Sequence, residues 1–231
     1  MKRTLLCLLA LLAWSTPAAP AAGSGTEIAA SGSGSVSLPP NVATVNASIV
    51  TNAPAADAAV SQNNAAYDRV VSAIVKTGVA RSDVTLAYYN MSYNPPPAAP
   101  APGSTERYGY TVSRGFAVKV RAVGDAGRVS DACTSAGATS VDGVSFGLAD
   151  TTAARAQATA KAFAQAQADA GAMAQAAGLH VVAIRRIELL SGPSGPTPMM
   201  RMAAAPSPAT QFDQGDVSVT VSLSVVFLAQ P

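Results

Sequence analysis

Three methionines lie within four residues near the C-terminal end of the chain, at Met199, Met200 and Met202. Thioether sulfur is a soft metal ligand, and three such groups together could hold Cu(I). The same side chains in an apolar loop could instead serve as a sacrificial site for oxidants. The sequence therefore offers a copper-binding loop as one hypothesis and a loop without a ligand as the simpler interpretation.

The chain contains few other groups that could catalyse a reaction. A Ser/His/Asp arrangement would need His180, the single histidine, which no nucleophile motif accompanies. Cys133 lies on the apolar stripe of a predicted helix and has no partner cysteine to resolve an oxidised thiol. The segment Ser31-Gly32-Ser33-Gly34 lacks the lysine and the following helix of a phosphate-binding loop. We therefore expect no catalytic residue, no cofactor and no enzymatic activity.

The tyrosines are the more informative side chains. Five of the six lie on two predicted strands around a proline-rich loop: Tyr88, Tyr89, Tyr93, Tyr108 and Tyr110. Neighbouring residues of a strand point to opposite faces, so Tyr88 and Tyr89 cannot both face one core. Core packing remains one interpretation, and a subunit or partner interface is the other. We take these five tyrosines as interface candidates.

Residues 1–22 have the features of a cleavable signal peptide. Lys2 and Arg3 precede an apolar stretch of roughly ten residues, and small residues follow it. That stretch is too short for a helix that spans a bilayer, which needs ~20 residues. Cys7 precedes most of the apolar stretch, whereas the cysteine of a lipoprotein would follow it. We expect a protein of the periplasm or cell envelope, with outer-membrane association included, and a mature chain without a transmembrane helix.

Charge and cysteine content narrow the class of partner. The chain has 15 basic and 13 acidic side chains, and cleavage would remove Lys2 and Arg3. The mature chain would then have equal numbers of both and a formal net charge of zero. A neutral chain without a basic cluster lacks the electrostatic footprint of a nucleic-acid-binding protein. With Cys133 as the single cysteine of the mature chain, no intrachain disulfide can form.

Hydrophobic periodicity and glycine positions predict the elements. Helices are expected at 54–76, 125–136 and 151–177, each followed by a glycine. Residues 31–50 are predicted to form a β-hairpin that turns at Pro39-Pro40-Asn41. Further strands are expected at 84–93, 108–123, 143–148, 181–190 and from Val217 onward, with the first two of these paired as a hairpin. The stretches 94–104 and 191–214 are rich in proline or in small residues and are predicted to be mobile loops.

Two details of this prediction concern packing. The alanine-rich helix 151–177 is expected to bury Phe163, Ala170, Met173 and Ala177. The last strand alternates valine and leucine with serine and threonine, so one of its faces should be buried and the other wet or in an interface. The predicted fold class is α+β, with antiparallel or mixed sheets packed on helices in the order β-β-α-β-β-α-β-α-β-β.

This order resembles the SIMPL-domain family, which includes bacterial periplasmic and outer-membrane-associated immunogenic proteins and an animal kinase-interacting protein. The resemblance covers nearly the whole mature chain. It is carried by Ser31-Gly32-Ser33-Gly34 with Pro40 and Ala43-Thr44-Val45, by Asn63-Asn64, by Gly109-Tyr110, by Val144-Ser145-Phe146, by Pro198-Met199-Met200-Arg201 and by Gly215-Asp216-Val217-Ser218-Val219. The family usually has an acidic residue where Ser33 stands.

The resemblance implies an α+β fold, export in bacteria, ring-like or channel-like oligomers in some members, and an association with tolerance of oxidative stress. It implies no catalytic residues. We expect a signal peptide at 1–22 and one SIMPL-like domain at 23–231. The leading hypothesis is an exported, non-catalytic protein that forms homo-oligomers or contacts envelope proteins through the tyrosine-rich hairpin and the last strand. A periplasmic module that binds a small ligand or copper through the methionine-rich loop is the alternative.

Overall fold

The structure is a computed structural model that describes residues 25–96, 108–190, 197–198, 212 and 214–231. The predicted signal peptide lies outside the described residues. So do most of the two predicted mobile loops and all three methionines of the candidate copper site. No helix in the described part of the chain is long and apolar enough to span a membrane.

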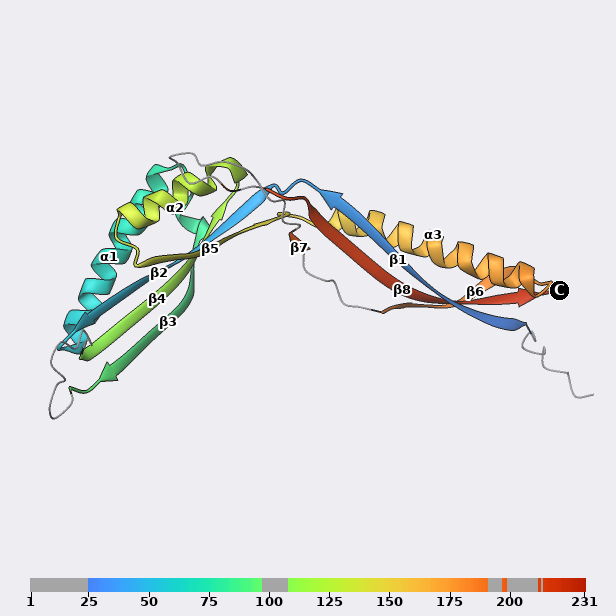
Figure 1. Cartoon of the computed structure of the whole chain (residues 1–231), viewed down its shortest axis with the longest axis horizontal. Coiled ribbons are helices and arrows are strands. Elements are labelled where there is room, and N and C mark those ends of the chain that lie inside the picture. The colour runs from blue at the N-terminus through green and yellow to red at the C-terminus, as the bar shows by residue number, and fades with distance from the viewer. Residues whose placement is uncertain (1–24, 97–107, 191–196, 199–211, 213) are drawn as a thin grey trace, which may run out of the picture.

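The described chain is elongated and has two lobes, each built on its own antiparallel sheet (Figure 1). The first lobe, here called the α3 lobe, has strands in the order β1-β8-β6, with the two-residue β7 also paired to β8, and one long helix on a single face. Its elements are β1 (Thr26–Leu38), α3 (Thr152–Ala176), β6 (His180–Leu189), β7 (Thr197–Pro198) and β8 (Val217–Gln230).

The second lobe, here called the α1–α2 lobe, has strands in the order β3-β4-β2-β5 with two helices on one face (Figure 1). Its elements are β2 (Val42–Ala53), α1 (Ala56–Lys76), β3 (Val84–Asn94), β4 (Gly109–Val120), α2 (Ala126–Ser135) and β5 (Ser140–Gly147). Single 3-10 turns at Arg81–Asp83 and Val123–Asp125 precede β3 and α2. The α+β class is confirmed, and the predicted order of elements holds with β7 as one short addition.

The predicted hairpin at 31–50 is wrong. β1 pairs with β8 from Thr26↔Ala229 to Leu38↔Val217, whereas β2 pairs with β4 and β5 in the other sheet. Pro39-Pro40-Asn41 is therefore one of the connections between the lobes and not a hairpin turn. The Asn41 N–H donates to the Gly147 carbonyl at 3.0 Å, and its Oδ1 accepts from the Ala149 N–H at 2.7 Å. The predicted hairpin of β3 and β4 is confirmed.

The two cores are built from different side chains. In the α1–α2 lobe, α1 and α2 pack large apolar residues such as Val70, Ile74 and Val129 against Phe116 and Val118 of the sheet. In the α3 lobe, the buried face of the helix consists of alanines four residues apart: Ala154, Ala158, Ala162, Ala166, Ala170 and Ala174. In each lobe the helical cover thus lies on one sheet face, but the side chains between helix and sheet differ in size.

Glycines in β1 explain the alanine stripe. A Cβ atom added at Gly32 would lie 1.9 Å from the Ala162 carbonyl oxygen, and one at Gly34 would lie 2.1 Å from the Ala158 carbonyl oxygen. The helix backbone therefore rests almost directly on the strand, and a larger side chain has no room between them. The prediction that Met173 and Ala177 face the sheet is wrong. Both are exposed, because Met173 is too large for this narrow space and Ala177 lies just past the end of α3. Phe163 is half-buried, and Ala170 alone of the four is buried.

Candidate interaction surface

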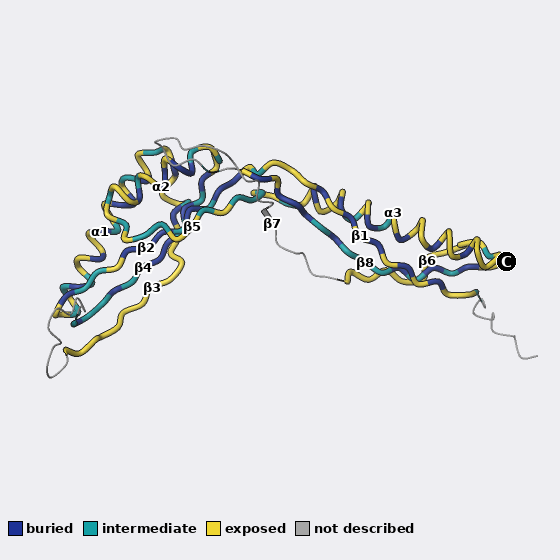
Figure 2. The backbone as a smooth tube through the Cα atoms, in the orientation of Figure 1, coloured by how far each residue is buried: buried dark blue, intermediate teal, exposed yellow. Residues whose placement is uncertain are grey.

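Strand β3 exposes ten of its eleven side chains, every one after Val84 (Figure 2). The cause is the position of α1, which packs on β2 and β4 and leaves the neighbouring strand uncovered. Leu86 is 59% exposed and Tyr93 is 54% exposed. Among the described residues β3 pairs with β4 alone, so the other edge of β3 is the edge of the sheet. An exposed apolar strand at a sheet edge is a ready template for another strand.

Both faces of β3 carry large side chains. The register places Tyr89 opposite Arg114 and Met91 opposite Val112, in the row of β4 that faces the helices. Tyr88 lies on the other face, where it covers Gly115: an added Cβ at this glycine would be 2.1 Å from Cε1 of Tyr88. The sequence argument that Tyr88 and Tyr89 face opposite sides is therefore confirmed.

Arg114 anchors the helix-facing side of this strand. Its guanidinium lies 4.6 Å from the ring centroid of Tyr67 and 5.2 Å from that of Tyr89, and its Nη2 donates to Asn64 Oδ1 at 2.6 Å. Its Nε is buried and lacks a hydrogen-bond partner in the described part of the chain. Guanidinium stacking on two aromatic rings holds Tyr89 in a defined position at the edge of the lobe.

Two neighbouring asparagines of α1, Asn63 and Asn64, make different contacts. Asn64 binds Arg114, as described, whereas Asn63 is fully buried and its Nδ2 donates to the carbonyls of Ile49 at 3.2 Å and Val112 at 3.3 Å. These bonds hold α1 over β2 and β4, so the helix does not extend over β3. Asn63 thus positions the helix that leaves β3 uncovered, and Asn64 positions the guanidinium of Arg114 beside that strand.

The other predicted tyrosines lie on the same hairpin. Tyr93 and Tyr110 contact each other with ring centroids 4.8 Å apart. Tyr110 is half-buried beside Ala53, Ala59 and Val112, and Tyr108 is half-buried just before β4. The structure thus places the five tyrosines on one hairpin with Tyr88, Tyr89 and Tyr93 exposed, and their role as an interface stays a prediction.

Strand β6 is a second exposed strand and was not among the interface candidates predicted from the sequence. All ten of its residues are exposed, and the register places its apolar residues Val181, Ile184, Ile187 and Leu189 opposite the helix-facing row of β8. In the linear sequence, apolar residues without strict alternation are also typical of a strand buried on both faces, so β6 could not be identified there as exposed. Arg185 pairs with Glu27, and Arg186 pairs with Glu188 at 3.3 Å. Two bulges also interrupt its ladder with β8.

The last strand, β8, was predicted as a contact surface but lies in the middle of its sheet. β8 lies between β1 and β6, so strands occupy both of its edges. Its apolar face is buried under α3, as predicted, and its hydroxyl face is half-exposed beside the exposed serines of β1. In particular, Ser222 lies opposite Ser33 and Thr220 opposite Ser35. Any contact made by β8 must therefore use this hydroxyl face.

The two remaining sheet edges are protected. On β1, Lys161 Nζ donates to the Ser35 carbonyl at 3.1 Å, and Gln165 Oε1 accepts from the Ser33 N–H at 3.0 Å. On β5, the strand has eight residues, contains Asp142 and is bulged against β2. Capped backbone groups, short length, charge and bulges all discourage strand addition. β3 is thus the least protected edge in the described structure.

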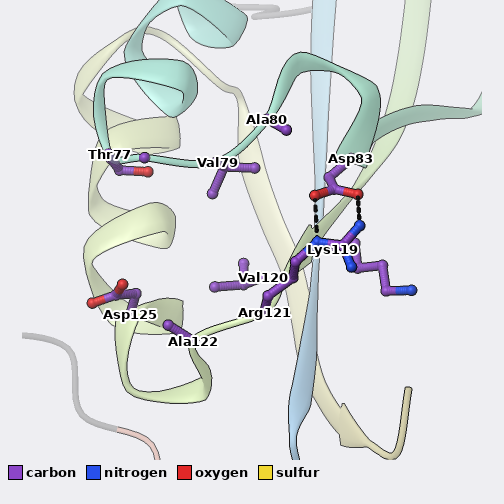
Figure 3. A pocket seen from close by; sticks show the side chains of 10 residues that line it. Thr77, Val79, Ala80, Asp83, Lys119, Val120, Arg121, Ala122 and Asp125 are labelled. Carbon is purple, nitrogen blue, oxygen red and sulfur yellow. Dashed lines mark hydrogen bonds and ion pairs between the residues drawn. The ribbon is translucent and has the colours of Figure 1, made fainter. Parts of the chain in front are cut away.

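A small hollow of about 250 Å³ lies where α1 and β4 end (Figure 3). Asp83 accepts from Arg121 Nη2 at 2.8 Å and from Nε at 3.0 Å, and this hydrogen bonding and charge raise the pKa of Arg121. Asp125 pairs with Arg128 at 3.0 Å, and Arg128 also donates to the Thr77 carbonyl at 2.9 Å. Both carboxylates of the hollow are thus paired with arginines, and Arg128 connects the end of α1 to the start of α2.

The other candidate groups are apart from one another. His180 is exposed at the start of β6, whereas Cys133 is fully buried in the core of the α1–α2 lobe. Burial raises the pKa of the Cys133 thiol to about 11, so the thiol is protonated and unreactive at neutral pH. The described residues contain no cluster of three or more His, Cys, Asp or Glu side chains that could hold a metal ion.

Comparison with known proteins found a matching family and two related bacterial proteins. A family model described as SIMPL, Protein of unknown function (DUF541), matches residues 28–227. The 26 kDa periplasmic immunogenic protein of Brucella melitensis biotype 1 is 29% identical over 209 residues, covering 87% of this chain and 84% of that protein. The protein of the same name from Brucella abortus strain S19 matches with the same identity and coverage. Neither the family description nor these names state an enzymatic activity.

Proposed function

Because the chain belongs to the SIMPL family, as the match over residues 28–227 shows, we propose that it is an exported, non-catalytic protein of the periplasm that acts by assembling with copies of itself. The names of the two Brucella relatives and the signal-peptide pattern of residues 1–22 support the location. The expected consequence of assembly is tolerance of envelope or oxidative stress, as the family resemblance implies.

The observation that carries this proposal is the exposure of β3. Leu86, Met91 and Tyr93 present apolar surface at an edge that no described strand covers. Burial of apolar surface is worth about 25 cal/mol per Å², so covering these side chains by a second molecule is favourable. Aromatic residues and methionine are also the types enriched at protein interfaces.

The first test is the solution mass of the chain from residue 23, measured by light scattering over a concentration series. We expect a discrete oligomer. A monomer at every concentration would contradict the proposal and would make a copper titration of the methionine-rich loop the next experiment.

Two matched methionines locate the contact surface. Met91 on β3 is 47% exposed and Met173 on α3 is 44% exposed. Met91→Ser should shift the oligomer toward smaller species without lowering the melting temperature, and Met173→Ser should leave the mass unchanged. Equal masses for both variants and the wild type would place the contact elsewhere.

A deletion strain complemented with these variants tests the physiological part of the proposal. Survival under oxidants should be restored by the wild type and by Met173→Ser, and less well by Met91→Ser. Full restoration by Met91→Ser, if that variant is monomeric in solution, would separate stress tolerance from assembly.

A further inference from the structure

The eleven residues of β3 include no Lys, Arg, Asp or Glu. Natural edge strands are usually protected by charge, by bulges or by a covering element. The bulge of β3 lies near its start, between Leu86 and Tyr88, and residues 88–94 pair with β4 in an unbroken register. A regular, uncharged stretch at an open edge is suited to strand addition.

We propose that β3 of one molecule pairs antiparallel with β3 of a second copy about a two-fold axis at Met91, the midpoint of residues 88–94. This inference rests on the proposed assembly and specifies its partner and geometry. The two four-stranded sheets of the paired α1–α2 lobes would become one continuous sheet of eight strands.

The absence of charge on β3 is what favours a second copy over another occupant. A two-fold axis places Met91 opposite its own counterpart and every other residue of 88–94 opposite another residue of the same segment, so a strand with charges of one sign would meet like charges, which is unfavourable for directly opposed residues. β3 has no such charge to oppose. β6 carries Arg185, Arg186 and Glu188 and is interrupted by two bulges, which makes it the poorer partner for an unbroken ladder.

The side chains of β3 also suit this register. With the axis at Met91, Tyr89 of one copy lies opposite Tyr93 of the other, on the face that α1 leaves uncovered, and Asn90 lies opposite Ser92 on the other face. Cross-strand aromatic pairs stabilise antiparallel strands. The paired tyrosines and Met91 would fill the strip of sheet between the two α1 helices, with Arg114 holding each Tyr89 from behind.

A cysteine at the axis gives a direct test, because residue 91 can approach its own counterpart only if β3 pairs with β3. Directly opposed residues of antiparallel strands have Cα atoms about 4.5–5.5 Å apart, within the range of a disulfide. Met91→Cys in a Cys133→Ala background, oxidised with copper phenanthroline, should convert most of the chain to a covalent dimer. Met173→Cys in the same background is the control for random collision and should stay monomeric on a non-reducing gel.

The outcomes of this test separate the two proposals. A cross-link at residue 91 no stronger than at residue 173, in a protein that light scattering shows to be oligomeric, would overturn the β3 pairing and leave assembly standing. A protein that is monomeric by light scattering would overturn both.

A charge exchange provides a second test that tolerates small losses of stability. Met91→Lys and Met91→Asp should each weaken dimerisation roughly tenfold or more, the equivalent of about 1.4 kcal/mol, because like charges meet at the axis. An equimolar mixture of the two variants should recover the dimer as a mixed species. Circular dichroism melts would confirm that each variant is folded. A folded Met91→Lys that dimerises as well as the wild type, or a mixture that fails to recover the dimer, would overturn the pairing of β3 with β3.

Discussion

The two lobes place a helix against an antiparallel sheet in opposite ways. In the α1–α2 lobe, branched and aromatic side chains such as Val70, Ile74 and Phe116 fill the space between helix and sheet. In the α3 lobe, an alanine stripe meets glycines of β1, and the backbones of helix and strand are nearly in contact. The distance between helix and sheet can thus be set either by large side chains that fill the space or by small residues that let the backbones meet.

These two solutions predict opposite sensitivities to mutation. Removal of side-chain volume should be costly in the α1–α2 lobe, where each large residue fills a part of the core. Addition of volume should be costly between α3 and β1. To make room, the helix would have to move off the sheet, and the hydrogen bonds of Lys161 and Gln165 to β1 would then be lost. The helix surface of each lobe should tolerate the change that harms the other, whereas large buried residues of β8 such as Phe227 should remain sensitive to truncation.

The largest effect is expected from Phe116→Ala. Phe116 is 1% exposed and contacts the ring of Tyr67 edge-on at 5.6 Å between centroids. The variant should lose about 3–5 kcal/mol of unfolding free energy, measured by urea denaturation with circular dichroism. Phe163→Ala, at a half-buried position of the α3 lobe, should cost less. A similar loss at both positions would contradict the difference between the lobes.

Gly32→Ala adds a single methyl group and should cost about 3 kcal/mol, at the upper end for overpacking, because the new Cβ would meet a backbone carbonyl rather than a flexible side chain. Ser33→Ala is the matched control. Its side chain is exposed and the hydrogen bond to Gln165 uses the backbone N–H, so the change should stay within about 0.5 kcal/mol. A tolerated Gly32→Ala would show that α3 can move off the sheet.

The sequence was sufficient to locate the elements but not to pair them. Glycines after each helix and the alternation of apolar residues gave bounds close to the observed ones: 54–76 was predicted where α1 is Ala56–Lys76. Alternation indicates that a segment is a strand with one buried face, but it carries no information about its neighbour. Pro39-Pro40-Asn41 suits a turn as well as a bridge between sheets, and the hairpin prediction failed there.

The buried face of α3 was also beyond the sequence. Large apolar residues normally mark the buried stripe of a helix, so Met173 was assigned to it. The opposite is true here, because the glycines of β1 admit nothing larger than a methyl group. The signal that could have found this is the four-residue spacing of alanines together with Gly32 and Gly34 two residues apart on a strand.

For the interaction surface, the sequence identified the tyrosines of β3 from the opposite faces of Tyr88 and Tyr89, and the structure confirms that both are exposed. It did not distinguish β6 from a buried strand, because an apolar strand without alternation fits either place. That distinction depends on which strands the helices cover, and helix position is a tertiary property.

The pH dependence of stability reports how completely the core of the α1–α2 lobe excludes water from Cys133. The pKa of the thiol is raised from about 9 to about 11 by burial, so the folded state holds its proton more tightly than the unfolded state. The associated stability is complete below about pH 9 and is lost as the pH rises toward 11, by on the order of 2 kcal/mol. Cys133→Ala should lack this part of the pH dependence in urea denaturation. An identical alkaline slope in both proteins would show that the thiol is not desolvated.

The smallest change in stability is expected at Gly171, which contrasts with Gly32 in the same lobe. Gly171 lies on α3 with ordinary helical geometry, and a Cβ added there would have no neighbour within 4 Å. Because glycine inside a helix is disfavoured relative to alanine, Gly171→Ala should stabilise the protein by about 0.5–1 kcal/mol, measured by the same urea denaturation. The same substitution is thus destabilising at Gly32 and stabilising at Gly171, because one glycine lies under the helix and the other faces away from the sheet. A loss of stability at Gly171 would mean that the outer surface of α3 is covered in solution, and the alanine helix would then have a second close neighbour.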